Sequence, residues 1–153
     1  MNTLQVSSPA FENGRPIPAI YTREGLDLSP PLKWSPPPEG TQSVAVICED
    51  VDTPKKPWVH WILYNLPAGN MCLKEGISHS EEPNGFLQGM NDYGEPGYGG
   101  PNPPHGKQHR YLFKVLALDS TLNLPGGITR EELYHSIQGH LLAQGQLMGK
   151  FQR

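Results

Sequence analysis

Two short segments carry most of the residues that could do chemistry. The first, CEDVDTP, places Asp50 at the end of an apolar run and is followed closely by WVHW, which contains His60. The second, GGPNPPHGKQHRY, reaches His109 and Tyr111 where a loop rich in proline and glycine gives way to another apolar run. Loops held by a rigid scaffold often carry function. If the two segments meet, these four residues line one small polar pocket.

The residue types suit the binding of a small anion. Neutral histidine offers one N–H donor, protonated histidine offers two, and tyrosine offers an O–H. We expect Asp50 to fix the orientation and protonation of a histidine. Asp52 would share a face with Asp50 on an extended backbone, although an Asp-Thr-Pro sequence also opens turns. Backbone N–H groups near Gly100 could complete an anion nest, because glycine allows close approach of a ligand.

Each candidate also has a structural explanation. His60 could be a neutral core histidine between two tryptophans, and Tyr111 could be a core side chain. A set of His60, His105, His109 and Asp50 could imitate a zinc site, but the chain has no HExxH and no strand-paired HxH. The sequence therefore predicts no metal and no cofactor. It also lacks the GxSxG of serine hydrolases and the GxxxxGK[ST] of a P-loop.

Length and charge exclude several classes of protein. A chain of 153 residues fits a single domain over residues 1–153. The net charge is −3 and no basic block occurs, so nucleic acid is not an expected partner. No apolar run approaches the roughly 18 residues that span a bilayer, and the first residues do not resemble a signal peptide. We expect a cytoplasmic protein without stable membrane insertion.

Glycine and proline, at 17 residues each, separate several strongly apolar runs, which indicates a loop-rich, mainly β domain. Strands are predicted over residues 43–48, 58–66 and 110–118. On one face of the second strand, simple alternation places the following residues: Trp58, His60, Ile62, Tyr64 and Leu66.

The C-terminal part of the chain begins with a helix signal. Residues 129–132 (TREE) form a capping box, and Leu133 and Ile137 give the following helix an apolar stripe. Gly139 and Gly145 argue against one helix to the end of the chain. We expect the chain to return to the sheet near residues 147–151.

Several motifs occur in order along nearly the whole chain. They are SPPLKW from residue 29, DVDTP from 50, WVHW from 58, NDYG from 91, GYGGPNPP from 97 and HRY from 109. In these motifs and their spacing the chain resembles the phosphatidylethanolamine-binding protein family, also called the Raf kinase inhibitor protein family. The resemblance is strongest to its small bacterial and archaeal members.

The resemblance implies a mainly β fold: an antiparallel β-sandwich of Greek-key character with one or two short peripheral C-terminal helices. It also implies a small pocket for phosphate-like and carboxylate anions, such as a phosphoethanolamine head group. The residues that it assigns to the pocket are Asp50, His60, His109 and Tyr111, with Pro54, Trp58 and Gly100 shaping the walls and Asp52 beside them. Binding would strengthen at mildly acidic pH, where histidines are charged.

Two other functions stay open at this point. Relatives in the family inhibit or modulate kinases or proteases, so the pocket rim could contact a protein partner. A hydrolase using an Asp–His pair as acid and base is a further alternative, although no activated nucleophile is visible. The resemblance to bacterial relatives is also compatible with a homodimer.

Overall fold

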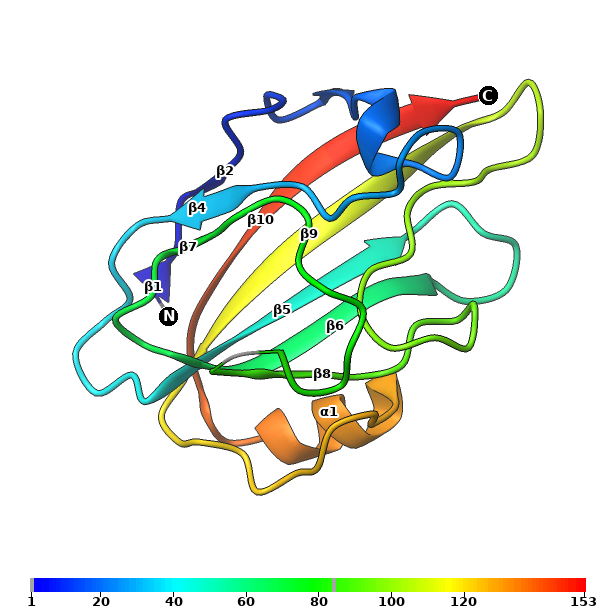
Figure 1. The fold of residues 1–153 in the computed structure, drawn as a ribbon. Helices are drawn as coiled ribbons and strands as arrows, with labels where there is room; N and C mark the ends of the chain where they lie inside the picture. Colours follow the sequence, from blue (N-terminus) through cyan, green and yellow to red (C-terminus); the bar gives the residue numbers. More distant parts are fainter. Residues whose placement is uncertain (1, 84) are drawn as a thin grey trace.

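A large sheet forms the centre of the structure, a computed structural model that describes residues 2–83 and 85–153 (Figure 1). Its long strands, in spatial order, are β10 (Leu141–Gln152), β9 (Gln108–Leu118), β5 (Ser43–Asp50) and β6 (Trp58–Pro67). Shorter strands extend its edges: β1 (Asn2–Thr3), β3 (Arg15–Pro16) and β8 (Leu87–Gln88). The long strands pair antiparallel, whereas β1 and β3 pair with β10 in parallel.

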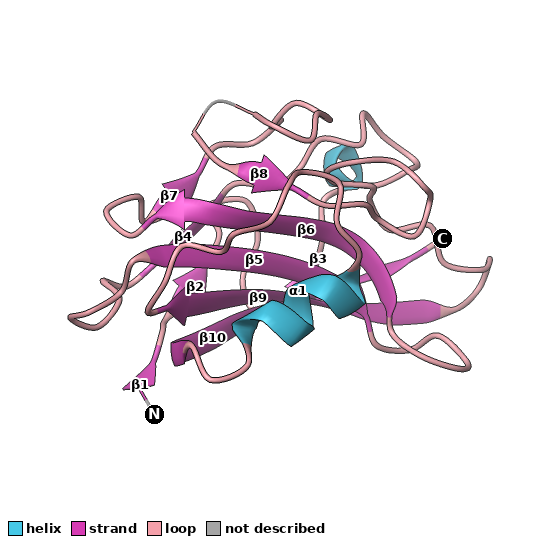
Figure 2. Cartoon of the chain, turned by 90° about the horizontal axis from the view of Figure 1, so that it is seen from below, coloured by secondary structure: helices cyan, strands magenta, loops and turns pink. Residues whose placement is uncertain are grey.

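Two layers cover the faces of this sheet. A small sheet of β2 (Val6–Ser7), β4 (Leu32–Trp34) and β7 (Cys72–Leu73) lies over one face, and helix α1 (Arg130–Ile137) lies over the other (Figures 1 and 2). One short 3-10 helix, Ala19–Tyr21, joins the first layer. The expected mainly β sandwich with a short peripheral helix is therefore confirmed. Across the described residues, no helix has the length and apolar character that crossing a membrane requires.

The two faces of the sheet bury separate cores. The core beneath the small sheet contains Trp61, Phe113 and Tyr111, and the core beneath α1 contains Ile62, Leu116 and Leu133, among others. All eight residues of β5 are buried, as expected for a strand that is covered on both faces. This burial explains why the β5 sequence shows a continuous apolar run instead of alternation.

The prediction for the faces of β6 is wrong for Ile62 and Tyr64, which lie on the other face of the sheet. Glu49 in β5 pairs with Val59 while the adjacent Cys48 pairs with Trp61, so His60 is an extra residue in a β-bulge. His60 and Trp61 consequently lie on the same side of the sheet, and Ile62 turns to the α1 side. A second bulge, where Val44 pairs with Leu66 and Val46 with Leu63, reverses the shift.

The C-terminal elements are partly as expected. Thr129 and Glu132 form the predicted capping box, and Leu133 and Ile137 are the buried residues of α1. Strand β10, however, begins at Leu141, well before residue 147. Gly145 lies within β10, at a point where the chain at Leu4 approaches closely. A Cβ at position 145 would come 2.0 Å from the carbonyl oxygen of Leu4, so a larger residue would not fit. This glycine serves a close approach between chain segments and does not end an element.

Candidate ligand-binding site

Strand pairing brings the two predicted segments together. Asp50, the last residue of β5, pairs with Tyr111 of β9 on one side and with Trp58 of β6 on the other. His109 lies two residues before Tyr111 on the same face of β9, and His60 lies on that face two residues after Trp58 in β6. The end of three adjacent strands therefore places an acid and two histidines side by side.

Asp50 and His109 form a closely held pair. Nδ1 of His109 lies 2.6 Å from Oδ2 of Asp50, and both residues are buried. The other carboxylate oxygen accepts the backbone N–H of Asp52 at 2.9 Å. Because a carboxylate accepts hydrogen bonds, Nδ1 of His109 carries a proton. Nε2 is then the ring nitrogen left to meet a ligand.

His60 is held by the backbone, so the histidine that Asp50 orients is His109. Its Nδ1 donates to the carbonyl oxygen of Gly99 at 2.5 Å, and its own carbonyl oxygen accepts the Gly99 N–H at 2.9 Å. Burial lowers the pKa of His60, and the Gly99 hydrogen bond and the charge of Asp50 offset this only in part. The ring is therefore neutral at pH 7, with its proton on Nδ1 and a lone pair on Nε2.

A cavity of about 210 Å³ opens beside these histidines. Its lining residues are Asp50, Thr53, Trp58, His60, Tyr93, Asn102, Pro103, Pro104 and His109. Pockets for drug-sized ligands usually enclose roughly 300–1,000 Å³, so this cavity suits a smaller group. Within the described parts of the chain, no group of three or more histidines, cysteines or acids could hold a metal ion.

Four of the predicted site residues do not line this cavity: Asp52, Pro54, Gly100 and Tyr111. Asp52 turns outward and accepts hydrogen bonds from the backbone N–H, Nε and Nη2 of Arg110. The hydrogen bond from the Arg110 side chain lowers the pKa of Asp52. Asp52 therefore forms a surface ion pair with Arg110 beside the pocket.

The expected anion nest at Gly100 is wrong, because its N–H is already used. It donates to Oδ1 of Asp27 at 2.7 Å, while the Gly100 carbonyl oxygen accepts from the Tyr93 hydroxyl at 2.8 Å. A Cβ at position 100 would lie 2.4 Å from the carbonyl oxygen of Tyr21, so only glycine fits here. Gly100 thus anchors the loop that holds His60 through Gly99.

Tyr111 lies behind the site. Its side chain is fully buried, and its ring packs edge-on against His60 with centroids 5.2 Å apart. Burial raises the pKa of Tyr111, and the charge of Asp50 raises it further. Among the described residues, its hydroxyl is one of three buried polar side-chain atoms without a hydrogen-bond partner. The hydroxyl is therefore a spare donor close to the Asp50 carboxylate.

The sequence analysis missed several contributors. Tyr93 and the loop residues Asn102, Pro103 and Pro104 line the cavity, and all four lie in motifs already singled out for the resemblance. Asp27 has no comparable signal, since it belongs to none of those motifs. It has a φ of 59°, in the left-handed region, and its carboxylate also contacts Arg23 Nε at 3.3 Å. An aspartate held in that conformation indicates a position fixed by its surroundings.

Asp27→Ala should destabilise the fold by about 1–3 kcal/mol, because it leaves the buried Gly100 N–H without its acceptor. Asp27→Asn keeps an acceptor oxygen and tolerates the left-handed backbone, so it should cost less than half as much. Urea unfolding of both variants measures this difference. Equal losses would show that the charge of Asp27 matters and the Gly100 hydrogen bond does not.

Comparisons with known proteins show the family to which the chain is similar. The family described as "Phosphatidylethanolamine-binding protein" matches residues 7–152. A UPF0098 protein of Methanothermobacter thermautotrophicus is 39% identical over 151 residues, covering 98% of this chain and 99% of the relative. A UPF0098 protein of Aquifex aeolicus is 41% identical over 152 residues, covering 98% of this chain and 89% of the relative.

Two crystal structures share the fold over almost the whole chain. A putative phosphatidylethanolamine-binding protein homologue of Chlamydia trachomatis, CT736, has a TM-score of 0.90 and 39% identity, with 100% of this chain and 99% of that chain covered. E. coli YbcL, described as a member of the mammalian PEBP family, has a TM-score of 0.90 and 31% identity, with 98% of each chain covered. The chain belongs to the phosphatidylethanolamine-binding protein family.

Proposed function

We propose that the pocket beside Asp50 binds the acid group of a small phosphate-bearing or carboxylate ligand, such as a phosphoethanolamine-like head group. One observation carries the proposal: the Nδ1 atoms of His60 and His109 are both committed to protein acceptors. Their Nε2 atoms are then left to meet a ligand in a cavity sized for a small group. Imidazole N–H groups form strong, charge-assisted hydrogen bonds to anions once the ring is protonated.

The size and lining of the pocket favour a head group over a whole lipid. A volume of about 210 Å³ has no room for acyl chains. Trp58 and Tyr93 pack edge-on with ring centroids 4.4 Å apart and form a rigid aromatic wall. Pro103 and Pro104 add further apolar contacts. The part of the ligand next to its acid group should therefore be short and aliphatic.

Binding should take up a proton. The free site holds His60 neutral, because burial lowers its pKa and its only proton points to Gly99. A fully ionised anion meets a lone pair at Nε2 and is repelled unless that nitrogen is protonated. The bound anion favours the charged ring and so raises the pKa of His60 above its value in the free protein.

Sulfate affinity should therefore be highest at low pH and fall as pH rises from 5 to 8. The decrease should approach, but not exceed, tenfold per pH unit for each proton taken up, since one pKa unit corresponds to about 1.4 kcal/mol. Sulfate is the better probe because it does not titrate in this range, whereas phosphate does. Isothermal titration calorimetry in two buffers of different ionisation enthalpy counts the protons directly. A flat profile with no proton uptake would contradict the proposal.

The hydrolase alternative has one feature in its favour and one against it. Asp50 and His109 are placed as a general acid–base pair would be. The aliphatic hydroxyl in the lining, that of Thr53, already donates to the Lys56 carbonyl oxygen. We therefore propose binding without turnover. Incubation with p-nitrophenyl phosphate should release no more p-nitrophenol than a blank, and His109-dependent release would support a hydrolase instead.

A further inference from the structure

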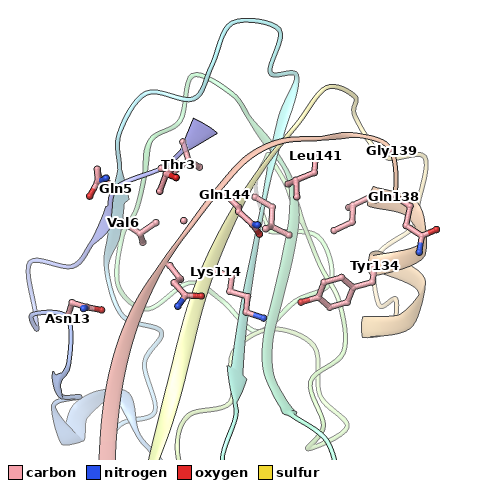
Figure 3. Close-up of a pocket in the computed structure, with 15 residues that line it drawn as sticks. Thr3, Gln5, Val6, Asn13, Lys114, Tyr134, Gln138, Gly139, Leu141 and Gln144 are labelled. Atoms are coloured by element: carbon pink, nitrogen blue, oxygen red, sulfur yellow. The ribbon is translucent and has the colours of Figure 1, made fainter. Parts of the chain in front are cut away.

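A larger groove lies away from this pocket, on the side of the large sheet that carries α1 (Figure 3). Its volume is about 920 Å³, within the range of typical small-molecule sites. Strands β9 and β10 form its floor. Residues 3–6 form one wall, and the C-terminal half of α1 forms the other. None of the residues that line the small pocket beside Asp50 belongs to this groove.

The N-terminal wall is firmly attached to the sheet. The Leu4 N–H donates to the Gln144 carbonyl oxygen at 2.9 Å, and the Gln5 N–H donates to Oγ of Ser35 at 2.9 Å. Gly145 allows the chain at Leu4 to approach so closely that a Cβ would meet it at 2.0 Å. The groove is therefore a fixed feature of the fold and not a gap beside a loose terminus.

The charge of the groove has one sign. Its described lining includes no aspartate or glutamate, and Lys114 is the one cation. Lys114 Nζ donates to Oε1 of Glu49 at 2.9 Å, and Arg130 pairs with the other oxygen of the same carboxylate. Two cations thus share one anion, which leaves an excess positive charge at the groove. An ammonium has three donors, so Lys114 retains capacity for a ligand.

Other hydrogen-bond donors lie close to this ammonium. The Tyr134 hydroxyl is 3.5 Å from Oε1 of Glu49, at the limit of a hydrogen bond, and is available for a better acceptor. In Figure 3 the Lys114 and Tyr134 side chains point toward one another across the groove. Gln146 lies directly opposite Lys114 in the strand register and can donate from its amide. This set of donors suits a carboxylate.

Apolar side chains lie on the α1 side of the groove, where Leu116, Ile137 and Leu141 pack with Tyr134. The rest of the lining includes polar side chains: Thr3, Gln5, Asn13, Gln138 and Gln144. A ligand that satisfies both parts has an acid group and an aliphatic body. We propose that this groove binds an aliphatic carboxylate, with its acid group at Lys114 and Tyr134 and its chain along the leucine and isoleucine side chains. This site is independent of the function proposed for the small pocket.

Octanoate is the probe that tests this assignment, with acetate and octanol as separate controls for the acid group and the chain. In ¹H–¹⁵N spectra of the full chain, octanoate should shift the amide signals of Gly139 and Gly145, which lie in the groove, in a saturable way. Acetate and octanol should bind at least about tenfold more weakly, because each lacks one half of the interaction. Absence of saturable shifts with octanoate, or equal binding of octanol, would overturn the proposal.

A matched pair of variants locates the acid group. Gln146→Glu places a carboxylate opposite Lys114, where it occupies the ammonium and repels the ligand. Gln152→Glu makes the same change on an exposed residue of β10 outside the groove. Octanoate affinity should fall about tenfold in Gln146→Glu and stay unchanged in Gln152→Glu. Equal affinities in the two variants would overturn the assignment.

The small pocket must be separated from the groove in the same experiment. Octanoate that entered the small pocket would shift the amides of Gly99 and Gly100 and would compete with sulfate. The expected result is no shift at these two residues and no competition at saturating sulfate. The reverse pattern would overturn the groove assignment while supporting anion binding in the small pocket, so the two proposals fail separately.

Discussion

His109→Asn should weaken sulfate and phosphoethanolamine binding by roughly tenfold to a hundredfold. Asparagine places its amide nitrogen where Nδ1 lies and can still donate to Asp50, but it has no second nitrogen to donate to the ligand. A hydrogen bond to a charged group is worth about 1.5–3 kcal/mol, which sets this range. Without the imidazole of His109, the Asp50 carboxylate has no cationic partner, and its negative charge repels the anion. Calorimetric titration at pH 6 measures the change.

The matched control is His105→Asn, the same substitution in the loop that precedes β9. His105 is exposed and does not line the cavity, so its loss should leave affinity within a factor of two. A similar loss in both variants would mean that general positive charge attracts the anion and that the Asp50–His109 pair has no special part.

Arg130→Met should destabilise the fold by about 3 kcal/mol. The Glu49 side chain is only 1% exposed, whereas its partners Lys114 and Arg130 are 28% and 32% exposed. Removing one partner from a buried pair leaves a carboxylate that has lost part of its compensation, at a cost of about 3–5 kcal/mol. Lys114 remains, which places the expected value at the lower end. Urea unfolding at pH 7 gives the free energy of unfolding.

Two further variants test the cause. Arg110→Met removes an arginine from an exposed pair with Asp52 and should cost much less stability than Arg130→Met, because solvent screens the pair. Adding Glu49→Leu to Arg130→Met should recover part of the stability, since an apolar side chain needs no partner. A double variant less stable than Arg130→Met would show that the arginine acts through packing.

The pH dependence gives an independent check. Burial raises the pKa of Glu49, but hydrogen bonds from Arg130 and Lys114 outweigh it and hold the pKa below its ordinary value of 4.5. A lowered folded pKa stabilises the protein above the unfolded value, and this stability is lost as pH falls through the folded pKa. The difference between wild type and Arg130→Met should therefore shrink in acid.

Local signals in the sequence predicted local structure well. The capping box at Thr129 and the apolar run that ends at Asp50 each specify an element from a few adjacent residues. The meeting of Asp50 with His109 was also predictable, because both lie where a strand joins a loop. The start of β10 was not, since its glutamines and glycines have weak strand propensity and the strand depends on pairing with β9.

Contacts between distant loops were beyond the sequence. The acceptor that holds Nδ1 of His60 is a backbone oxygen of Gly99, which no side-chain pattern indicates. The N–H of Gly100 was expected to be free, but Asp27, which none of the recognised motifs contains, accepts its hydrogen bond. Backbone partners leave little trace in side-chain identity, so such contacts required the three-dimensional structure.

The two bulges of β6 compensate for each other, because each adds one residue to the alternation of side chains along the strand. The extra residue at His60 reverses which side chains face each core, and the extra residue between Leu63 and Leu66 restores the original frame. Deleting His60 alone would leave Val59 opposite Glu49 and Trp61 opposite Cys48, so both cores would keep their side chains while the pocket lost its ligand-facing histidine. The pocket histidine is therefore an inserted residue of β6, and the second bulge restores the original alternation of side chains a few residues later.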